Sequence, residues 1–297
     1  MDPGCRPAAD VRARGGGFLQ RPGGLLLGSI WSASPGPVGE LGRESGHGVD
    51  RSLPFARGQT GADRQQPLVL GSSAAAVLLH EAVAHTLEAD TLSLSGRPEA
   101  ACGFSLGSPL LDVLDDPGAA PEGVARRFDD EGVPVVRRWL LRAGEVKEPL
   151  ADLRFAAGSE RLSPGAGRRS DRHSVPVPRS THLELLAGDT GEGALFDAAR
   201  KGLFLPEAGR GSLDPIAGEF SLWFPYGRRI GPDGPSDYIG PCRLRGRVSE
   251  ILAAVAAVGD KPRFGGAGWC AKGGVRLPVW ATCPSLLVEG LSVEVSA

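Results

Sequence analysis

The 297-residue sequence has no long apolar run, no strong net charge and no regular cysteine pattern. No stretch approaches the roughly 18 consecutive apolar residues that a helix needs to cross a bilayer, so we expect no membrane partner. The 33 basic and 35 acidic side chains give a net charge of -2, which argues against a protein that coats nucleic acid. Five scattered cysteines do not make a disulfide framework, and the N-terminal residues lack the apolar core of a secretory signal. We therefore expect a reduced, cytoplasmic protein.

The composition divides the chain into two parts near residue 67. Residues 1–66 are dense in Gly and Pro, and their apolar residues follow neither a helical nor a strand period. Such a segment buries too little surface to offset its ordering entropy, so we expect it to be mostly disordered or extended. Within it, residues 24–31 (GLLLGSIW) favour a short strand. Residues 67–297 are predicted to form the folded domain.

The folded part is predicted to begin with a strand and a long helix. The apolar residues 68–70 precede Gly71 and are typical of a buried strand. Ser72 or Ser73 offers an N-cap hydroxyl, and the Ala/Leu/Val-rich residues 74–88 have high helix propensity. This pattern indicates the principal helix of the chain.

Short apolar segments separated by turn residues follow from about residue 110. They predict an α+β fold, a strand-rich C-terminal domain with one long helix. Residues 133–141 and 145–146 favour a hairpin with Gly144 at its turn. The other predicted strands cover residues 182–186, 219–226, 243–248, 277–280 and 285–295. Two shorter helices are predicted at residues 194–201 and 249–258, the second ending at Gly259.

The sharpest local motif lies inside the long helix. It is an H-E-x-x-x-H sequence, in which Glu81 follows His80 and the second histidine is His85. Zinc hydrolases commonly use H-E-x-x-H, whose two His share one helix face. A spacing of five residues turns the second ring by about 140° on a regular helix, whereas a π-bulge brings the rings to within about 50°. The motif therefore predicts either a metal site on a distorted helix or two unrelated His on an ordinary one.

Two His are too few for a catalytic zinc, which usually takes three protein ligands and leaves one position for water. Cys270 is a candidate third ligand, because the glycines of GGAGWCAKGG permit close approach of the backbone to another element. The alternative for a lone Cys is a small buried hydrophobe. Spacing alone does not select Cys270 over His173, His182 or Cys242.

The acidic cluster Asp129-Asp130-Glu131 also has two interpretations. Paired carboxylates can take part in acid/base chemistry or orient a His ligand. Because Gly132 follows the cluster, a turn at the start of the hairpin is the favoured interpretation.

Residues 67–90, PLVLGSSAAAVLLHEAVAHTLEAD, closely resemble the metal-binding segment of the TldD/PmbA peptidases, also called modulators of DNA gyrase. Four further blocks match this family in the same order, so the resemblance covers about residues 67–297. These blocks are DDEG at 129–132, PVPRST at 176–181, the glycine-rich run at 204–220, and GWCAKGG at 268–274 followed by LPV at 277–279.

The resemblance implies a defined set of site residues. It implies a zinc ion held by His80, His85 and Cys270, with Glu81 as the general base. A thiolate and two neutral imidazoles suit Zn2+, and an adjacent Glu can take a proton from water. Arg179 lies in another matching block and has two interpretations, a group that binds a peptide carboxylate or carbonyl, or a structural ion pair.

The expected function is that of a zinc-dependent peptidase acting on flexible or unfolded peptide segments, in proteolysis or peptide maturation. The alternative is a non-catalytic peptide-binding or assembly subunit that retains zinc as a structural staple. The resemblance also implies assembly, either as a homodimer or as a heterodimer with a TldE/PmbA-like subunit. Members of the family usually carry an α/β region before the metal helix, where this chain has Gly/Pro-rich residues.

Overall fold

The computed structural model describes residues 27–32, 65–94, 96, 98–120 and 125–295. The prediction of disorder for residues 1–66 therefore falls mostly outside the described residues. The short strand predicted there is confirmed and is β1, Leu27–Ser32. Among the helices of the described part, none is long and apolar enough to cross a membrane.

The described residues form a strand-rich α+β fold, as the sequence predicts. The large sheet has eleven strands in the order β19-β14-β11-β10-β1-β16-β17-β8-β3-β4-β5, and a second sheet has six in the order β13-β12-β9-β2-β18-β15. Two strands, β6 and β7, pair separately. The strands after β1 are β2 Gln66–Leu70, β3 Val113–Asp115, β4 Arg138–Arg142, β5 Glu145–Val146, β6 Gly167–Arg168, β7 Val177–Pro178, β8 His182–Leu185, β9 Leu203–Leu205, β10 Arg210–Asp214, β11 Glu219–Phe224, β12 Gly227–Gly231, β13 Gly234–Ile239, β14 Cys242–Arg247, β15 Val255–Val258, β16 Arg263–Lys272, β17 Val275–Cys283, β18 Leu286–Leu291 and β19 Val293–Val295.

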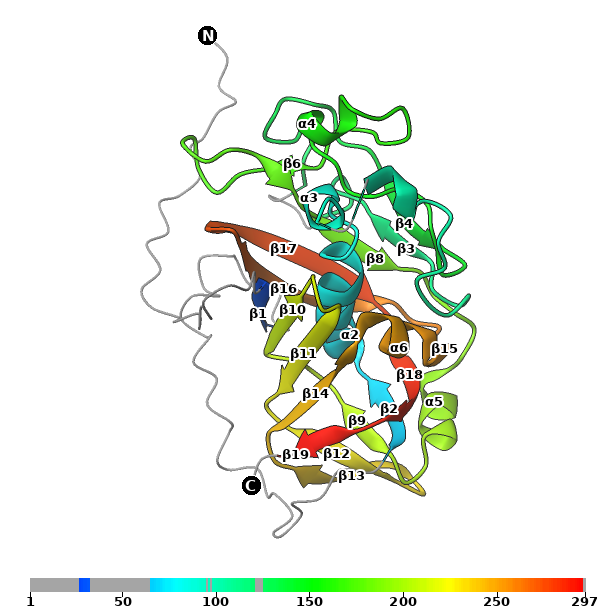
Figure 1. Cartoon of the computed structure of the whole chain (residues 1–297). Coiled ribbons are helices and arrows are strands. Elements are labelled where there is room, and N and C mark those ends of the chain that lie inside the picture. The colour runs from blue at the N-terminus through cyan, green and yellow to red at the C-terminus, as the bar shows by residue number, and fades with distance from the viewer. Residues whose placement is uncertain (1–26, 33–64, 95, 97, 121–124, 296–297) are drawn as a thin grey trace.

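The helices are short, and the central one carries the histidine motif. It consists of α2, Ser72–Leu79, continued directly by the π-helix η1, His80–Ala84. The others are α3 Ala89–Leu92, η2 Pro98–Ala101, α4 Leu153–Ala156, α5 Glu192–Ala198 and α6 Val248–Ala253. Figure 1 shows α2 in the middle of the molecule, and it contacts strands of both sheets, among them β16, β17 and β2.

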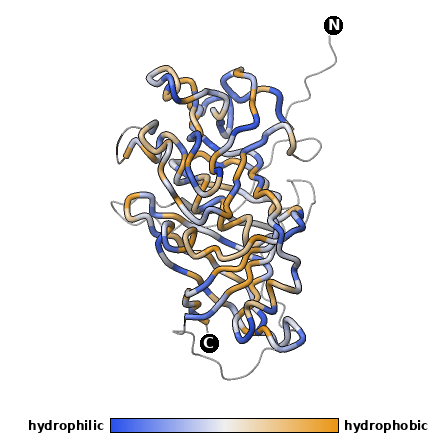
Figure 2. The backbone as a smooth tube through the Cα atoms, turned by 90° about the vertical axis from the view of Figure 1, so that its right-hand side faces the viewer, coloured by the Kyte–Doolittle hydropathy of each residue, from blue (hydrophilic) through white to orange (hydrophobic). Residues whose placement is uncertain are grey.

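The core surrounds this central helix. All residues of α2 after Ser72 are buried, and so are all five residues of η1. The apolar residues among them pack into one large cluster with apolar residues of both sheets. Figure 2 shows that many hydrophobic segments lie in the middle of the molecule. A helix that is apolar on every side is stable only when it is enclosed, and this explains why the Ala/Leu/Val-rich segment lies between the sheets.

The start of the central helix differs from the prediction. The N-cap residue is Gly71, not Ser72 or Ser73, and the cap makes no side-chain hydrogen bond. A Cβ atom at Gly71 would lie 2.6 Å from the backbone oxygen of Pro206, so the chain passes too close for any side chain at this position. Close packing therefore overrides the usual preference for a hydroxyl cap.

The predicted helix at residues 249–258 is wrong in its second half. Helix α6 ends at Ala253, and residues 255–258 form β15, which pairs antiparallel with β18. Val255 and Val258 are buried while Ala256 is exposed. β-branched residues suit a half-buried strand, and the edge of β18 supplies the hydrogen-bond partners that a local pattern cannot reveal.

The strand predicted at residues 285–295 is two strands, β18 in the six-stranded sheet and β19 in the eleven-stranded sheet. The other predicted elements are present with shifted ends. The hairpin turns at Ala143 and Gly144, both of which have positive φ, but its first strand covers only residues 138–142. The predicted helix at 194–201 is α5, Glu192–Ala198.

Candidate metal centre

The two histidines of the motif lie together because the helix changes its period between them. The backbone N–H of His85 donates to the carbonyl oxygen of His80 at 3.1 Å, an i→i+5 bond of a π-helix. The ring centroids are 4.5 Å apart with the planes at 70°. The predicted local distortion is therefore confirmed, since a regular helix would direct the two rings to different sides.

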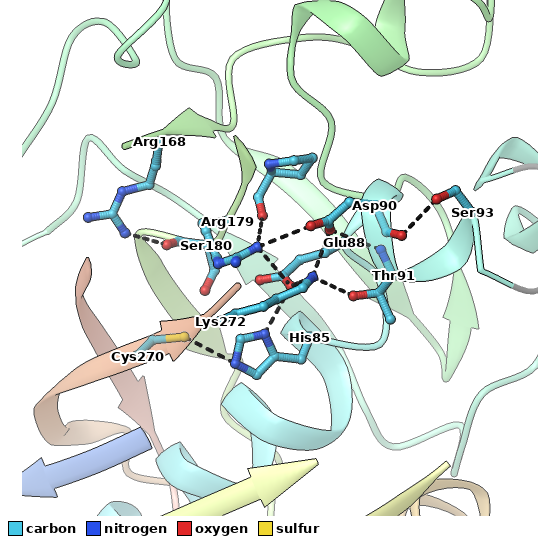
Figure 3. Close-up of polar contacts among 11 residues, drawn as sticks. His85, Glu88, Asp90, Thr91, Ser93, Arg168, Arg179, Ser180, Cys270 and Lys272 are labelled. Carbon is cyan, nitrogen blue, oxygen red and sulfur yellow. Dashed lines mark hydrogen bonds and ion pairs between the residues drawn. The ribbon is translucent and has the colours of Figure 1, made fainter. Parts of the chain in front are cut away.

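Cys270 joins the two histidines from the sheet. It lies in β16, is buried, and its Sγ is 3.1 Å from His85 Nε2, as Figure 3 shows. One donor atom from each of His80, His85 and Cys270 lies within 4.8 Å of the others. The ligand atoms of a tetrahedral zinc ion are roughly 3.5 Å apart, so two imidazoles and a thiol at these distances fit that metal.

The other residues that the spacing left open lie elsewhere. His182 is on β8, where its Nε2 lies 3.0 Å from Thr282 Oγ1. His173 is exposed. Cys242 is buried in β14, and burial raises the pKa of its thiol to about 12. Within the described residues, these groups do not form part of the cluster with His80 and His85.

The electrostatics of the centre favour a cation shared by its donors. Burial, together with the positive charge of His85, lowers the pKa of His80 well below its usual value. Burial also acts to lower the pKa of His85, but Cys270 and Glu88 outweigh it and raise that pKa to about 10. A metal ion held by His80, His85 and Cys270 would replace the proton of His85 as the positive charge among these donors.

Glu81 is fully buried next to His80 and abuts β10. A Cβ atom at Gly211 of β10 would lie 2.5 Å from Glu81 Cγ and 2.6 Å from Oε1. The glycine is thus required for the Glu81 carboxylate to occupy its place between the helix and the strand. Gly211 belongs to the glycine-rich run at residues 204–220, and this run permits the close approach of β10 to the helix.

A second layer of charged residues holds His85, and sequence reasoning missed it. Glu88 Oε2 lies 2.9 Å from His85 Nδ1 and also accepts a hydrogen bond from Lys272 Nζ at 2.6 Å. The ammonium group of Lys272 donates further to Asp90 Oδ1 at 2.7 Å and to Thr91 Oγ1 at 2.6 Å (Figure 3). A His whose Nδ1 faces a carboxylate presents Nε2 to a metal, which is the usual support of a histidine ligand.

Glu88 keeps its negative charge although it is completely buried. Burial alone would raise its pKa, but Arg179, His85 and Lys272 together lower it well below the usual value. A signal for this layer was present in the sequence. Glu88 follows His85 by three residues, and Lys272 follows Cys270 by two along β16, a spacing that puts both pairs on common faces.

Arg179 contacts this layer. Its side chain is 2% exposed, and Nη1 donates to the Pro178 carbonyl at 2.6 Å and to Glu88 Oε2 at 3.3 Å. Asp90 lies 3.6 Å away. These contacts are those of a structural ion pair, and a role of Arg179 in substrate binding stays a prediction.

The acidic cluster forms a turn. Asp129 Oδ1 accepts from the backbone N–H groups of Glu131 and Val133, and Oδ2 accepts from that of Gly167. Gly132 has φ of 80°, in the left-handed region that favours glycine. The Asp129 carboxylate thus accepts hydrogen bonds from three backbone N–H groups and stabilises the turn, as the favoured interpretation predicts.

A cavity of about 240 Å³ lies near the C-terminal end of β10. Its lining includes Thr86, the residue after His85, and Leu213 at the end of β10, with Arg247 also among its walls. The candidate ligands His80, His85 and Cys270 are not among the residues that line this cavity, and neither is Glu81.

Fold and site together define a strand-rich α+β domain whose π-helix and sheet assemble a His-His-Cys centre. The sequence model of one protein family, the PmbA/TldA metallopeptidase C-terminal domain, matches residues 63–295. The chain belongs to this family.

Several known proteins are similar to the chain over much of its length. The metalloprotease TldD homolog of Haemophilus influenzae is 30% identical over 229 residues, which cover 76% of this chain and 48% of that protein. A metalloprotease of Methanothermobacter thermautotrophicus is 29% identical over 258 residues, covering 86% and 55%. The crystal structure of TldE from Thermococcus kodakarensis shares the fold with a TM-score of 0.64 at 20% identity, over 77% of this chain and 50% of that one. The chain thus spans about half the length of these relatives.

Proposed function

We propose that the chain is a zinc-dependent peptidase that hydrolyses flexible or unfolded peptide segments. One observation carries the proposal: three buried donors of a zinc type converge within 4.8 Å, with Glu81 adjoining His80 in the same π-helix. A zinc ion at such a centre supplies Lewis-acid chemistry, which polarises a peptide carbonyl and makes water a nucleophile near neutral pH. Relatives named metalloproteases support the same reaction class.

The chain's own residues have separate tasks in this proposal. His80, His85 and Cys270 hold the cation, and Glu88 keeps the His85 ring oriented. Glu81 takes the proton of the attacking water and passes it to the amine that leaves. The reaction so balanced adds one water across one peptide bond and needs no other reactant.

In this proposal the protein binds its substrate through the extended main chain of the peptide. The centre lies beneath strands β10 and β16 of the large sheet, because Gly211 abuts Glu81 and Cys270 belongs to β16. A peptide in contact with a strand edge binds through backbone hydrogen bonds, which tolerate many sequences. Only a flexible or unfolded segment can adopt that extended form. Assembly with a second copy or with a TldE-like subunit is a further part of the proposal.

The test separates metal binding from hydrolysis. Glu81→Gln should retain about one zinc per chain by elemental mass spectrometry while hydrolysis of an unfolded peptide library is lost. Glu289→Gln, the same change at an exposed position, should retain both. If the parent protein holds zinc and cleaves no peptide, the zinc has a structural role in a non-catalytic binding subunit. The burial of all three donor residues favours this alternative.

A further inference from the structure

Strand β1 lies between strands β10 and β16 of the large sheet and pairs with both. It pairs antiparallel with β10, from Leu27 opposite Leu213 to Ile30 opposite Arg210. On its other side it pairs antiparallel with β16, from Gly28 opposite Ala271 onward. The second edge of β10 is taken by β11 and that of β16 by β17 (Figure 1). Since neighbouring strands lie about 4.8 Å apart, β1 fills a slot that is one strand wide.

This slot runs over the candidate metal centre. The backbone of residue 29 is paired with Cys270 on one side and with Gly211 on the other. Cys270 is a candidate ligand, and Gly211 is the position that Glu81 abuts. β1 also contacts the π-helix η1, which begins at His80 and is followed by His85. The main chain of β1 therefore crosses the centre between a candidate ligand and the candidate base.

We propose that residues 27–32 act as a built-in competitor, which fills the peptide slot and keeps the centre self-inhibited until an extended peptide displaces it. The proposal rests on the proposed peptidase function and deepens it by naming the slot and its regulation. A peptide that added to the edge of β10 or β16 would need the same backbone groups that β1 now uses. Two strands cannot satisfy those groups at once, so binding of peptide and of β1 is mutually exclusive.

The strength of the inhibition follows from the occupancy of the slot. β1 belongs to the same chain as β10 and β16, which makes its return to the slot an intramolecular event with a high effective concentration. If β1 occupies the slot about nine-tenths of the time, only about one-tenth of the molecules can bind peptide. The apparent Kd for peptide is then raised about tenfold.

The test weakens the strand without touching the centre. In the full chain, Ser29→Pro with Ile30→Pro removes two backbone donors and is incompatible with a strand paired on both edges. Ser29→Ala with Ile30→Val is the matched control, since it alters the same side chains and retains the donors. Both pairs are made in a Glu81→Gln background, and the binding of an unstructured, fluorescein-labelled peptide of Gly, Ser, Val and Leu is measured by anisotropy. The proline pair should bind at least about tenfold more tightly than the control.

A second measurement covers the case in which the proline pair disturbs folding. Hydrogen exchange of the Glu81→Gln protein is followed with and without an excess of the same peptide. The amides of residues 27–32 should exchange faster once peptide is present, while those of β10 and β16 stay protected. A bound peptide that leaves residues 27–32 protected would overturn the proposal. A fall in Tm of the proline pair with no gain in peptide binding would also overturn it, because β1 would then be a structural strand.

Failure of this inference and failure of the peptidase proposal give different results. With Glu81 intact, hydrolysis by the proline pair should exceed that of the control about tenfold at low peptide concentration. Tighter binding without any hydrolysis would support the competitor and refute the peptidase. Equal hydrolysis and equal binding in both variants would support the peptidase and refute the competitor.

Discussion

The contact between Gly211 and Glu81 permits a test of the proposed general base that leaves every metal ligand in place. A Cβ atom at Gly211 would lie 2.5 Å from Glu81 Cγ, whereas ordinary contacts of this kind are 3.4–4 Å. In Gly211→Ala the Glu81 side chain or strand β10 must therefore move by about 1 Å. The proposed ligands His80 and Cys270 belong to η1 and β16, and His85 directly follows η1, so we expect the zinc content to remain about one per chain.

The expected effect of Gly211→Ala on catalysis is much larger than its effect on stability. A displacement of about 1 Å in a catalytic group lowers kcat on the order of 100-fold. Overpacking of a well-filled site costs about 1–3 kcal/mol in the free energy of unfolding. The variant should therefore stay folded while it loses nearly all hydrolysis.

The assay compares kcat, zinc content and Tm of Gly211→Ala with those of Gly246→Ala. Gly246 lies in β14 of the same sheet, and a Cβ atom there would be 3.5 Å from the ring of Phe220, an ordinary contact. This control should keep the parent's kcat. Full hydrolysis by Gly211→Ala with unchanged zinc would refute the reasoning, because Glu81 would then not act from the position that it occupies against β10.

Three further predictions concern the metal and the buried charges. Cys270→Ser should strongly lower the zinc content measured by elemental analysis, because a soft thiolate ligand is lost. Cys242→Ser should leave the zinc content unchanged. Equal zinc in Cys270→Ser and in the parent protein would contradict the assignment of Cys270 as a ligand. Glu88→Gln should weaken zinc binding about 10–100-fold in a chelator competition, because the His85 ring loses its carboxylate partner; unchanged affinity would show that the ring needs no such support. Burial raises the pKa of Asp115 from 3.8 to about 6. The folded state is therefore not penalised by this group below about pH 3.8, where it is neutral in the folded and the unfolded chain. Stability of the folded state is lost as the pH rises through 6, because the buried carboxyl group must then ionise. Asp115→Asn should hence raise the free energy of unfolding by up to about 3 kcal/mol near pH 7 and by little near pH 4, measured by urea denaturation; an equal gain at both pH values would exclude this charge effect.

The distortion of the central helix was within reach of sequence reasoning because it is a local property. Five residues separate His80 from His85, and the geometry of a helix requires a π-turn if both rings are to meet. The observed bond between His85 N–H and the His80 carbonyl is the one expected if the two rings share a site, which is one of the two interpretations that the spacing left open. The turn at Gly132 was predictable for the same reason, since its signal lies within a few adjacent residues.

Features that depend on a residue far away in the sequence could not be predicted from local sequence patterns. Cys270 Sγ meets His85 Nε2 across 185 positions of sequence, and only the family resemblance selected it from the other candidates. Residues 255–258 follow a helical pattern, yet they form a strand because the edge of β18 is beside them. Gly71 replaces a hydroxyl cap because Pro206 lies against it.

The sequence by itself determined the α+β class, the central helix with its break and the two histidines with their adjacent glutamate. Each of these is specified by residues within one or two helical turns or by the overall alternation of strands and turns. The tertiary structure alone decided that Lys272 and Arg179 share the buried carboxylate of Glu88, and that β1 crosses the centre between β10 and β16. Such contacts depend on the packing of segments far apart in the chain, because a buried charge or a strand edge is satisfied by whichever group the fold brings to it.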